Sequence, residues 1–600
     1  MCGIGGWFGE GDAISLEGLG QSLAHRGPDG FGQWEDPNGQ AGMVHTRLSI
    51  LDLSAAGTQP MVYSVTDTVG TEPTQYRLVF NGEIYNFREL RAELEGKGET
   101  FSSHSDTEVL LRLLVREGTA ALPKLAGMFA FAFWNPCTGQ AILCRDGLGI
   151  KPLYYAIQSN RLLFASEFRA IQSVVAEQRP DPDAIQDFLL WGSFQEPATL
   201  VHEIRQLPAG SYLEWQDGQA AIRQWYTPRF ESLAFTKDPV AFTRTALLES
   251  VNRHLVSDVP IGIFLSGGID STAIVALSRE LLGNNADLRT FSISFDEAEF
   301  DESPVISRTV ERFQTNHTQW KMTSVEGAAE VGPYLAAMDQ PTTDGFNTWC
   351  VSKLARRAGV KVVLSGLGGD ELFAGYDSFR QLARLKWAHQ ATLGTGRLLG
   401  GCLRKVTHSP RFGRLAAFLE GNGKTISAYH ALRGYFTPTE AKRLVKQLVG
   451  QLPSAPNWNE PDVNRTNVVS FLEMTRYMRN QLLRDSDVFS MAQGLELRVP
   501  FVDTRLFDAV ATIPAAIRLR QGKQLLLESV PEIPIWVREQ PKRGFRFPFQ
   551  KWMNDGFGDL LSTAEKSSEI PLVTWYRRWA VATVMNRLQS IPARHEVVSR

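Results

Sequence analysis

The second residue of the chain, Cys2, is the first candidate for chemistry. It follows the initiator methionine and precedes Gly3, and small residues at these positions favour removal of Met1. A free α-amine has a pKa of about 7.7–8.0, so part of it can accept a proton near neutral pH. An N-terminal thiol can therefore use its own amine as a general base, directly or through water. We expect Cys2 to be a nucleophile, and the alternative is a cysteine that happens to stand second.

Five short segments that follow in order favour the nucleophile. They are residues 25–30 (HRGPDG), 47–52 (RLSILD), 80–86 (FNGEIYN), 105–108 (SDTE) and 145–155 (RDGLGIKPLYY). Together with Cys2 they resemble the glutaminase domain of class II glutamine amidotransferases, which are N-terminal nucleophile hydrolases. The resemblance covers residues 2 to about 210.

The resemblance implies catalytic roles at three positions. Cys2 would attack the side-chain amide of glutamine, giving a thioester and ammonia. The Asn81 side chain and the Gly82 backbone N–H would stabilise the oxyanion of the tetrahedral intermediate. Taken singly, Asn81-Gly82 is also typical of an ordinary turn.

The same resemblance implies a glutamine pocket. The planar fork of Arg47 would pair with the α-carboxylate, because a planar cation suits a planar anion. Asp106 would accept the α-ammonium group. Glu83 and the backbone of four consecutive residues would complete the pocket, and these four are Leu48, Ser49, Ile50 and Leu51. The alternative for each charged residue alone is a surface ion pair.

A glycine loop marks a second candidate site. Residues 261–265 read as a buried strand, and they lead into SGGIDS (266–271) and a helix with one apolar face. Glycines let backbone N–H groups approach phosphate, and the helix N-terminus adds positive potential. The loop lacks the GxxxxGK[ST] pattern of a Walker A loop. It resembles the PP-loop of ATP pyrophosphatases, which cleave ATP between its α and β phosphates.

A similar unit follows at residues 362–371, where a short strand leads into SGLGGDE. Ligands of open parallel sheets bind beyond the carboxyl ends of the strands, so both loops should meet there. We expect Asp270 and Asp370 to converge as oxygen ligands for Mg²⁺, and the alternative is two helix caps. The residues expected to bind ATP are Leu265, Ser266, Gly267, Gly268, Asp270, Ser271, Ile293, Ser365 and Gly366.

Two downstream segments, 491–503 (MAQGLELRVPFVD) and 542–545 (KRGF), extend the resemblance. The whole chain resembles the glutamine-hydrolysing asparagine synthetase family. A lysine at the position of Lys542 stabilises the adenylated intermediate and the leaving pyrophosphate in that family. The alternative for Lys542 is a solvated basic patch with Arg543 and Arg546.

The resemblance implies a complete reaction. ATP with Mg²⁺ would convert aspartate into a β-aspartyl-adenylate, and ammonia released at Cys2 would travel between the domains to give asparagine. Two departures from the family pattern leave open which carboxylic acid is amidated. Leu367 stands where an acidic residue is usual in the family, and residues 340–349 differ from the usual substrate segment. The alternatives are amidation of another carboxylate, such as a sugar acid or a cell-surface precursor, an ATP pyrophosphatase that modifies tRNA, and a non-catalytic paralogue.

The elements that must position these residues fall into two parts. Strands at 76–80, 128–134 and 140–144 and a helix at 106–117 predict an α+β domain, and the resemblance implies layered sheets with helices. Strands alternate with helices after residue 240, which predicts an α/β parallel sheet, and the chain is mostly helical beyond residue 380. We expect a glutaminase domain at 2–212, a linker at 213–240 and a synthetase-like domain at 241–600. The sequence assigns no role to the helical segment 385–470 or to the last 30 residues.

Composition excludes several classes of protein. The 600 residues hold 62 Lys and Arg against 65 Asp and Glu, a net charge of −3, which argues against a nucleic-acid partner. The sequence contains no run of 18 apolar residues, so we expect no membrane span. The N-terminus does not have the basic and apolar stretches of a secretory signal. Five cysteines without a CxxC pair favour a reducing cytoplasm and argue against structural zinc. We expect small-molecule partners, no nucleic acid and no membrane, with a homodimer left open.

Overall fold

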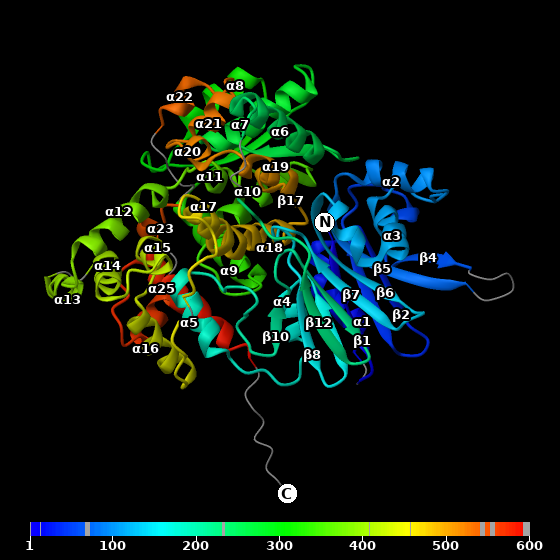
Figure 1. Cartoon of the computed structure of the whole chain (residues 1–600), viewed down its shortest axis with the longest axis horizontal. Coiled ribbons are helices and arrows are strands. Elements are labelled where there is room, and N and C mark those ends of the chain that lie inside the picture. The colour runs from blue at the N-terminus through cyan, green and yellow to red at the C-terminus, as the bar shows by residue number, and fades with distance from the viewer. Residues whose placement is uncertain are drawn as a thin grey trace, which may run out of the picture.

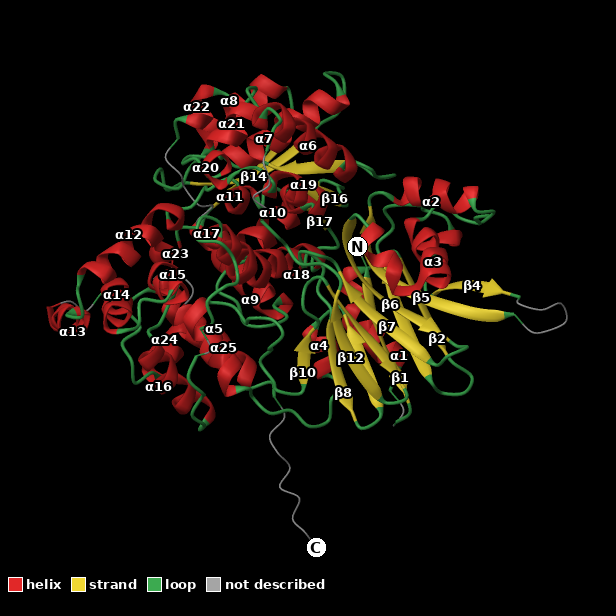
Figure 2. Cartoon of the chain, viewed as in Figure 1, coloured by secondary structure: helices red, strands yellow, loops and turns green. Residues whose placement is uncertain are grey.

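The N-terminal part of the chain contains two stacked antiparallel sheets (Figures 1 and 2). The computed structural model describes residues 2–591 apart from 12–13, 67–72, 231–234, 407–408, 457, 541–546 and 553–557. The first sheet has the order β10 (Ile204–Gln206), β8 (Tyr154–Gln158), β9 (Arg161–Ala165), β1 (Gly3–Gly9), β3 (Ala41–Arg47) and β2 (Gly30–Glu35). The second has the order β12 (Gln219–Gln224), β11 (Ser211–Gln216), β7 (Gln140–Arg145), β6 (Gly127–Asn135), β5 (Thr74–Ile84) and β4 (Met61–Val65).

Apolar side chains hold the two sheets together. Ile4 and Phe8 of β1 share a buried cluster with Val79 of β5 and Trp134 of β6. Helices cover the outer faces: α1 (Leu16–Leu23) packs on β1 and β3, and α3 (Asp106–Glu117) packs on β5. The remaining helices of this part are α2 (Phe87–Gly96), α4 (Phe168–Gln172) and α5 (Pro182–Trp191). The predicted fold of layered sheets with helices is confirmed.

The structure corrects the interpretation of Asn81-Gly82 as a turn. Both residues lie inside β5, opposite Ala130 and Phe129 of β6. Gly82 has a φ of +154°, and a Cβ on it would lie 2.1 Å from the Met128 carbonyl oxygen. Close approach of the neighbouring strand, rather than a turn, therefore requires this glycine.

The structure also corrects the start of the predicted linker at residue 213. Residues 211–224 form the hairpin β11–β12, whose strands extend the second sheet beside β7. All six residues of β12 are exposed, so the strand lacks the alternation of buried and exposed positions that a half-buried strand shows. The sheet thus extends to Gln224, within the segment predicted as linker.

A parallel sheet organises the second part of the chain, as predicted. Its order is β15 (Asn316–Met322), β14 (Arg289–Phe295), β13 (Ile261–Phe264), β16 (Val362–Leu364) and β17 (Glu496–Arg498). All four neighbouring pairs are parallel. The central strands are largely buried, as expected for a sheet covered by helices on both faces. The helix α6 (Pro239–His254) precedes the first of these strands, and the helices that follow, up to β16, are α7 (Ile269–Leu282), α8 (Ser303–Phe313), α9 (Ser324–Ala337) and α10 (Phe346–Arg357).

Between β16 and β17 the chain is helical, and it is helical again after β17. The helices before β17 are α11 (Gly369–Leu372), α12 (Ser378–Ala391), α13 (Gly396–Val406), α14 (Pro410–Glu420), α15 (Thr425–Arg433), α16 (Pro438–Val449), α17 (Val468–Leu472), a π-helical stretch (Glu473–Leu483) and α18 (Arg484–Met491). Those after it are α19 (Thr504–Ala511), α20 (Ala515–Arg518), α21 (Gln524–Ser529), α22 (Ile535–Arg538), α23 (Phe549–Trp552), α24 (Gly558–Ser567) and α25 (Trp575–Leu588). Among the described helices, none is long and apolar enough to cross a membrane.

Candidate active site

A pocket forms around Cys2 at the start of β1. It brings together eight of the residues that the sequence assigns to glutamine chemistry. These eight are Cys2, Arg47, Leu48, Ile50, Leu51, Gly82, Glu83 and Asp106. The remaining lining residues, which the sequence analysis missed, are Gly57, Gln59, Phe80, Ser105 and Thr107. Ser49 and Asn81 do not line the pocket, and the backbone N–H of Ser49 donates instead to Asp29 Oδ2 at 2.8 Å.

Asn81 lies directly behind Cys2. Its fully buried side chain accepts a hydrogen bond at Oδ1 from the Cys2 nitrogen, 3.0 Å away. Its Nδ2 group is buried and donates to no partner in the described part of the chain. A buried amide N–H without a partner is costly, so such a group is a candidate donor to a ligand. Burial also raises the pKa of the Cys2 thiol, which keeps that thiol protonated.

Two of the charged residues that line the pocket are Arg47 and Asp106. Backbone carbonyls of Ser54, at 2.9 Å, and Asp52 accept from the Arg47 guanidinium and fix its direction. Asp106 begins α3, where the Ser105 side chain caps the helix by accepting from the Thr107 N–H at 3.1 Å. Burial raises the pKa of Asp106 to about 6. Asp106 is therefore ionised at neutral pH and can accept from a cation.

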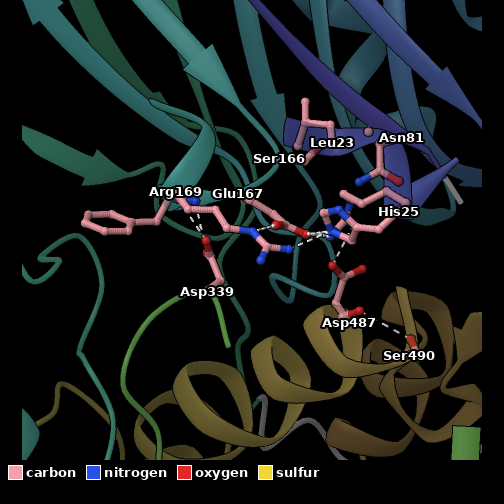
Figure 3. A network of polar contacts seen from close by, with 12 residues as sticks. Leu23, His25, Asn81, Ser166, Glu167, Arg169, Asp339, Asp487 and Ser490 are labelled. Carbon is pink, nitrogen blue, oxygen red and sulfur yellow. Dashed lines mark hydrogen bonds and ion pairs between the residues drawn. The ribbon is translucent and has the colours of Figure 1, made fainter. Parts of the chain in front are cut away.

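A buried ionic network joins the Cys2 region to the second part of the chain (Figure 3). Arg26 donates from Nε to the Cys2 carbonyl oxygen at 3.1 Å and from Nη2 to Asp487 Oδ2 of α18 at 2.7 Å. Its third contact is with Glu167, at 3.0 Å, and Glu167 is also contacted by His25 at 2.8 Å. Although burial opposes ionisation of Glu167, the cations around it outweigh burial and lower its pKa. A helix of the second part thus contacts the nucleophile through one arginine.

Arg498 of β17 contacts both candidate sites. Its buried guanidinium lies 3.2 Å from Glu83 of the Cys2 pocket and donates to Glu496 at 2.6 Å. Its backbone carbonyl accepts from the Ser365 N–H at 2.9 Å, at the start of the second glycine loop. One strand therefore connects the pocket and the loop through a single residue.

The two glycine loops meet, as predicted. A Cβ on Gly366 would lie 2.8 Å from the Ser271 nitrogen, so the loops are in direct backbone contact. Ser266 Oγ and Ser271 Oγ are 3.0 Å apart, and Gly268 stands at the N-cap of α7. The Gly267 N–H donates to the Glu302 carboxylate at 3.0 Å, which demonstrates that this loop can hold an anion. The side chains of Leu265 and Ile293 are buried in the core beside the loops.

Lys523 links the two aspartates that the sequence proposes as metal ligands. Its Nζ contacts Asp270 and lies 2.5 Å from Asp370. Burial opposes its charge, but the two carboxylates outweigh burial and raise the pKa of Lys523. The carboxylates thus converge on one cationic point, which fits the hard oxygen donors that Mg²⁺ prefers. Within the described ranges no three His, Cys, Asp or Glu side chains gather as a metal cluster, so the other ligands would come from phosphates and water.

Lys523 and Glu302 are functional candidates that the sequence analysis missed. Lys523 is 253 residues from Asp270, and a lone lysine after Gly522 carries no recognisable pattern. Lys542, which the resemblance singles out, lies outside the described residues.

Comparison with known proteins accounts for both parts of the chain. The family model "Asparagine synthase" matches residues 243–597, more than half of the sequence. The chain belongs to the asparagine synthase family. The model of the glutamine amidotransferase domain matches residues 1–226, which include the Cys2 pocket. As a member of this family, the protein is a carbon–nitrogen ligase that carries a glutamine-hydrolysing domain.

Relatives of this asparagine synthase family member match along most of its length. The chain is 32% identical over 595 residues to asparagine synthetase [glutamine-hydrolyzing] 1 of Bacillus subtilis, covering 95% of this chain and 90% of that protein. It is 31% identical over 585 residues to a putative asparagine synthetase [glutamine-hydrolyzing] of Mycobacterium tuberculosis, covering 92% and 87%. It is 26% identical over 585 residues to amidase chry2 of Gibberella zeae, covering 88% and 84%.

Proposed function

We propose that the protein transfers the amide nitrogen of glutamine to aspartate, driven by cleavage of ATP to AMP and pyrophosphate. The observation that supports this most is the double contact of Arg498, which touches the Cys2 pocket with its side chain and the second glycine loop with its backbone. Because β17 contacts both the Cys2 pocket and the second glycine loop, the structure favours a reaction in which the pocket provides ammonia to the site at the loops. Following the family resemblance, we also propose a cytoplasmic location, and a homodimer stays a prediction.

The Cys2 pocket would release ammonia. The neutral α-amine takes the thiol proton and the sulfur attacks the amide carbon. The α-ammonium then returns the proton to the leaving nitrogen, so the collapsing intermediate releases ammonia and leaves a thioester that water hydrolyses to glutamate. Asn81 Oδ1 would orient the amine, while its Nδ2 group and the Gly82 N–H receive the oxyanion. Arg47 would hold the α-carboxylate of glutamine and Asp106 its α-ammonium. Glu83 and the backbone of Leu48, Ile50 and Leu51 would close the pocket, while the Ser49 N–H stays bonded to Asp29.

The glycine loops would activate the acid. The backbone N–H groups of Gly267 and Gly268, with Ser266 and Ser271, would cradle the phosphates of ATP, and Ser365 and Gly366 would complete the cradle. Leu265 and Ile293 would border the adenine through their backbone. Asp270 and Asp370 would hold Mg²⁺, which supplies charge neutralisation on the pyrophosphate. Lys523 and Lys542 would stabilise the charge that develops on the phosphates.

The chemistry explains why two sites belong together. A carboxylate oxygen attacks the α-phosphorus of ATP, pyrophosphate leaves, and AMP becomes the leaving group that ammonia displaces. Free ammonia in water at neutral pH is largely protonated and unreactive. We therefore propose an internal route for ammonia along the interface that Arg26, Asp487 and Arg498 form.

One observation favours a second acceptor. Leu367 places an apolar side chain in the second glycine loop where relatives of this family usually carry an acid. In the resembled family that acid is tied to forming the β-aspartyl-adenylate, so a carboxylate other than aspartate is the alternative acceptor. The 26% identity to a protein named amidase chry2 is compatible with this alternative.

The experiment is a panel of carboxylic acids scored by pyrophosphate release, with glutamine, ATP and Mg²⁺ present. We expect aspartate to give asparagine, AMP and pyrophosphate in equal amounts. If glutamine is hydrolysed but aspartate releases no pyrophosphate, and another acid does, the second acceptor replaces aspartate. If no acid in the panel releases pyrophosphate, the proposed ligase reaction is wrong.

A further inference from the structure

The helices α12, α13 and α14 form a basic arm at the outer edge of the molecule, far from the two stacked sheets (Figure 1). Residues 378–420 contain eight Lys and Arg, of which Arg414 is buried, and one acidic residue, Glu420, which gives a net charge of +7. The whole chain has a net charge of −3, so positive charge is concentrated here. Glu420 is itself paired with Arg404. A concentration of one sign of charge on a protruding arm favours a partner of opposite charge.

The helix α13 exposes an apolar stripe. Leu398, Leu399, Cys402 and Val406 are spaced at i, i+1, i+4 and i+8, which places them on one face of the helix. Leu398 is 74% exposed, Leu399 50% and Val406 83%. The opposite face is buried through Gly396 and Gly400, where a Cβ would lie within 2.8 Å of α14. The stripe therefore points away from the helix that holds α13 in place.

Basic side chains border this stripe. Arg397 and Lys405 are exposed on α13 beside Leu398. On α12, Trp387 is 71% exposed and shares a helix face with Arg384 and with Arg380, which pairs with Asp377 at 3.1 Å. Leu393, in the turn between α12 and α13, is 91% exposed. Large apolar residues are seldom exposed in such number within one short segment of a soluble surface.

We propose that this arm binds an anionic lipid surface. Helices that lie in a membrane interface combine an apolar stripe with flanking Lys and Arg, and Trp is favoured at the level of the headgroups. The stripe is convex, because it runs along the outer side of a protruding helix. A fluid bilayer accepts a convex apolar helix without a preformed groove, and anionic headgroups supply the complementary charge. Surface association of this kind needs no membrane-spanning helix.

Two other occupants fit the observations less well. A second copy of the chain would bring two arms of net charge +7 together, which is repulsive. A nucleic acid would pair with the Lys and Arg but gain nothing from the exposed Leu398 and Val406. An acidic protein would need a groove that matches the convex stripe.

The test is co-sedimentation of the full chain with vesicles of phosphatidylcholine alone or of phosphatidylcholine with 30% phosphatidylglycerol. We expect binding to the anionic vesicles that weakens as salt rises, and little binding to the neutral ones. Leu398→Ser with Val406→Ser removes the apolar contact, and Arg397→Glu with Lys405→Glu reverses the charge. Each double variant should weaken binding at least about tenfold.

The matched control is Val325→Ser with Ile535→Ser, which removes apolar residues of similar exposure (78% and 65%) outside the arm. The control should bind vesicles as the unchanged protein does. All variants should keep the same pyrophosphate release in solution, because none touches the glycine loops. The proposal is overturned if the unchanged protein does not sediment with anionic vesicles, or if both arm variants bind as well as the control. Retention on an acidic polypeptide or on DNA without vesicle binding would replace the lipid by that partner.

Discussion

The pocket around Cys2 and the site at the glycine loops differ in what their polar groups contact. Behind the pocket, Asn81 Oδ1 accepts from the Cys2 nitrogen, and the buried Nδ2 group of the same side chain has no acceptor in the described part of the chain. At the loops, the corresponding groups already have protein partners: the Gly267 N–H donates to Glu302, and Asp270 and Asp370 contact Lys523. Glutamine can therefore bind to groups that are already placed, whereas ATP with its metal must replace internal contacts.

This difference predicts which substitutions should affect glutamine hydrolysis and which should affect the reaction with ATP. The pocket depends on residues fixed by two sheets, and binding there needs no rearrangement that the structure shows. At the loops, ATP and its metal ion must replace the contact of Glu302 with the Gly267 N–H and the contacts of Lys523 with the two aspartates, so altering Glu302 or Lys523 should change the reaction with ATP. Five substitutions or conditions separate the two sites.

The largest expected effect comes from Cys2→Ala. Loss of the nucleophile should reduce glutamine-dependent product formation by at least about 10³-fold, while ammonia-dependent formation stays within about twofold. Both rates are measured by pyrophosphate release and product analysis. Cys137→Ala removes an exposed thiol and should behave as the unchanged protein. Survival of glutamine use in Cys2→Ala would show that the nucleophile is misassigned.

Lys523→Ala should affect the other site alone. Removing a cation that faces the phosphates should lower pyrophosphate release about 10²–10³-fold, and glutamine hydrolysis should be unchanged. The control is Lys353→Ala, which removes a partly buried lysine paired with Glu330 away from the loops. Circular dichroism checks that both variants fold. Unchanged ATP kinetics in Lys523→Ala would contradict the proposal that Lys523 stabilises charge on the phosphates.

Arg498→Lys tests the connection between the sites. Lysine keeps the charge but loses the planar fork that contacts Glu83, Glu496 and two backbone carbonyls. We expect glutamine hydrolysis and pyrophosphate release both to fall about tenfold. Arg505→Lys, which alters an exposed ion pair with Glu89 across the same two parts, should leave both rates unchanged. An effect on only one activity would argue against a shared role.

The pH dependence of glutamine binding should identify Asp106. Its pKa of about 6 means that it loses its charge as pH falls through 6, and a neutral carboxyl no longer pairs with the α-ammonium of glutamine. We expect the KM for glutamine to rise about fivefold between pH 6 and pH 5, because the ionised fraction of Asp106 falls by that factor. Asp106→Asn should have a high KM that does not change over this range. A KM that does not change with pH in the unchanged protein would contradict the role of Asp106 in binding the α-ammonium of glutamine.

Glu302→Ala should have the smallest effect, and in the opposite direction. The Gly267 N–H would no longer donate to an internal carboxylate and would be available to phosphate. We expect the KM for ATP to fall about two- to fivefold. Glu299→Ala alters an exposed carboxylate of the same loop, paired with Lys551, and should leave KM unchanged. A rise in KM for Glu302→Ala would instead make Glu302 part of the ATP site.

Local patterns predicted the elements with strong local signals. The helix over residues 106–117 is confirmed as α3, because Ser105 caps it and its apolar residues recur at helical spacing. The strand at 362–364 is confirmed as β16. The interpretation of Asn81-Gly82 as a turn was wrong because the neighbouring strand of a large sheet overrides a dipeptide preference.

The parts of the site that sequence could not predict rest on distant pairs. Lys523 meets Asp270 across 253 residues, and Arg498, on the edge strand β17 of the parallel sheet, meets Glu83 of the other part of the chain. No spacing within either segment indicates its partner. The places of Cys2 and Arg47 in one pocket could be predicted because each stands in a short segment that resembles the glutaminase domain.

The central claim is that nitrogen passes from Cys2 to the activated acid inside the protein. The direct test supplies [amide-¹⁵N]glutamine together with excess unlabelled ammonium, and measures ¹⁵N in the amide product by mass spectrometry. The account predicts product labelled almost as fully as the glutamine, because released ammonia does not mix with the solution. Label diluted to the proportion present in the bulk ammonia would contradict it.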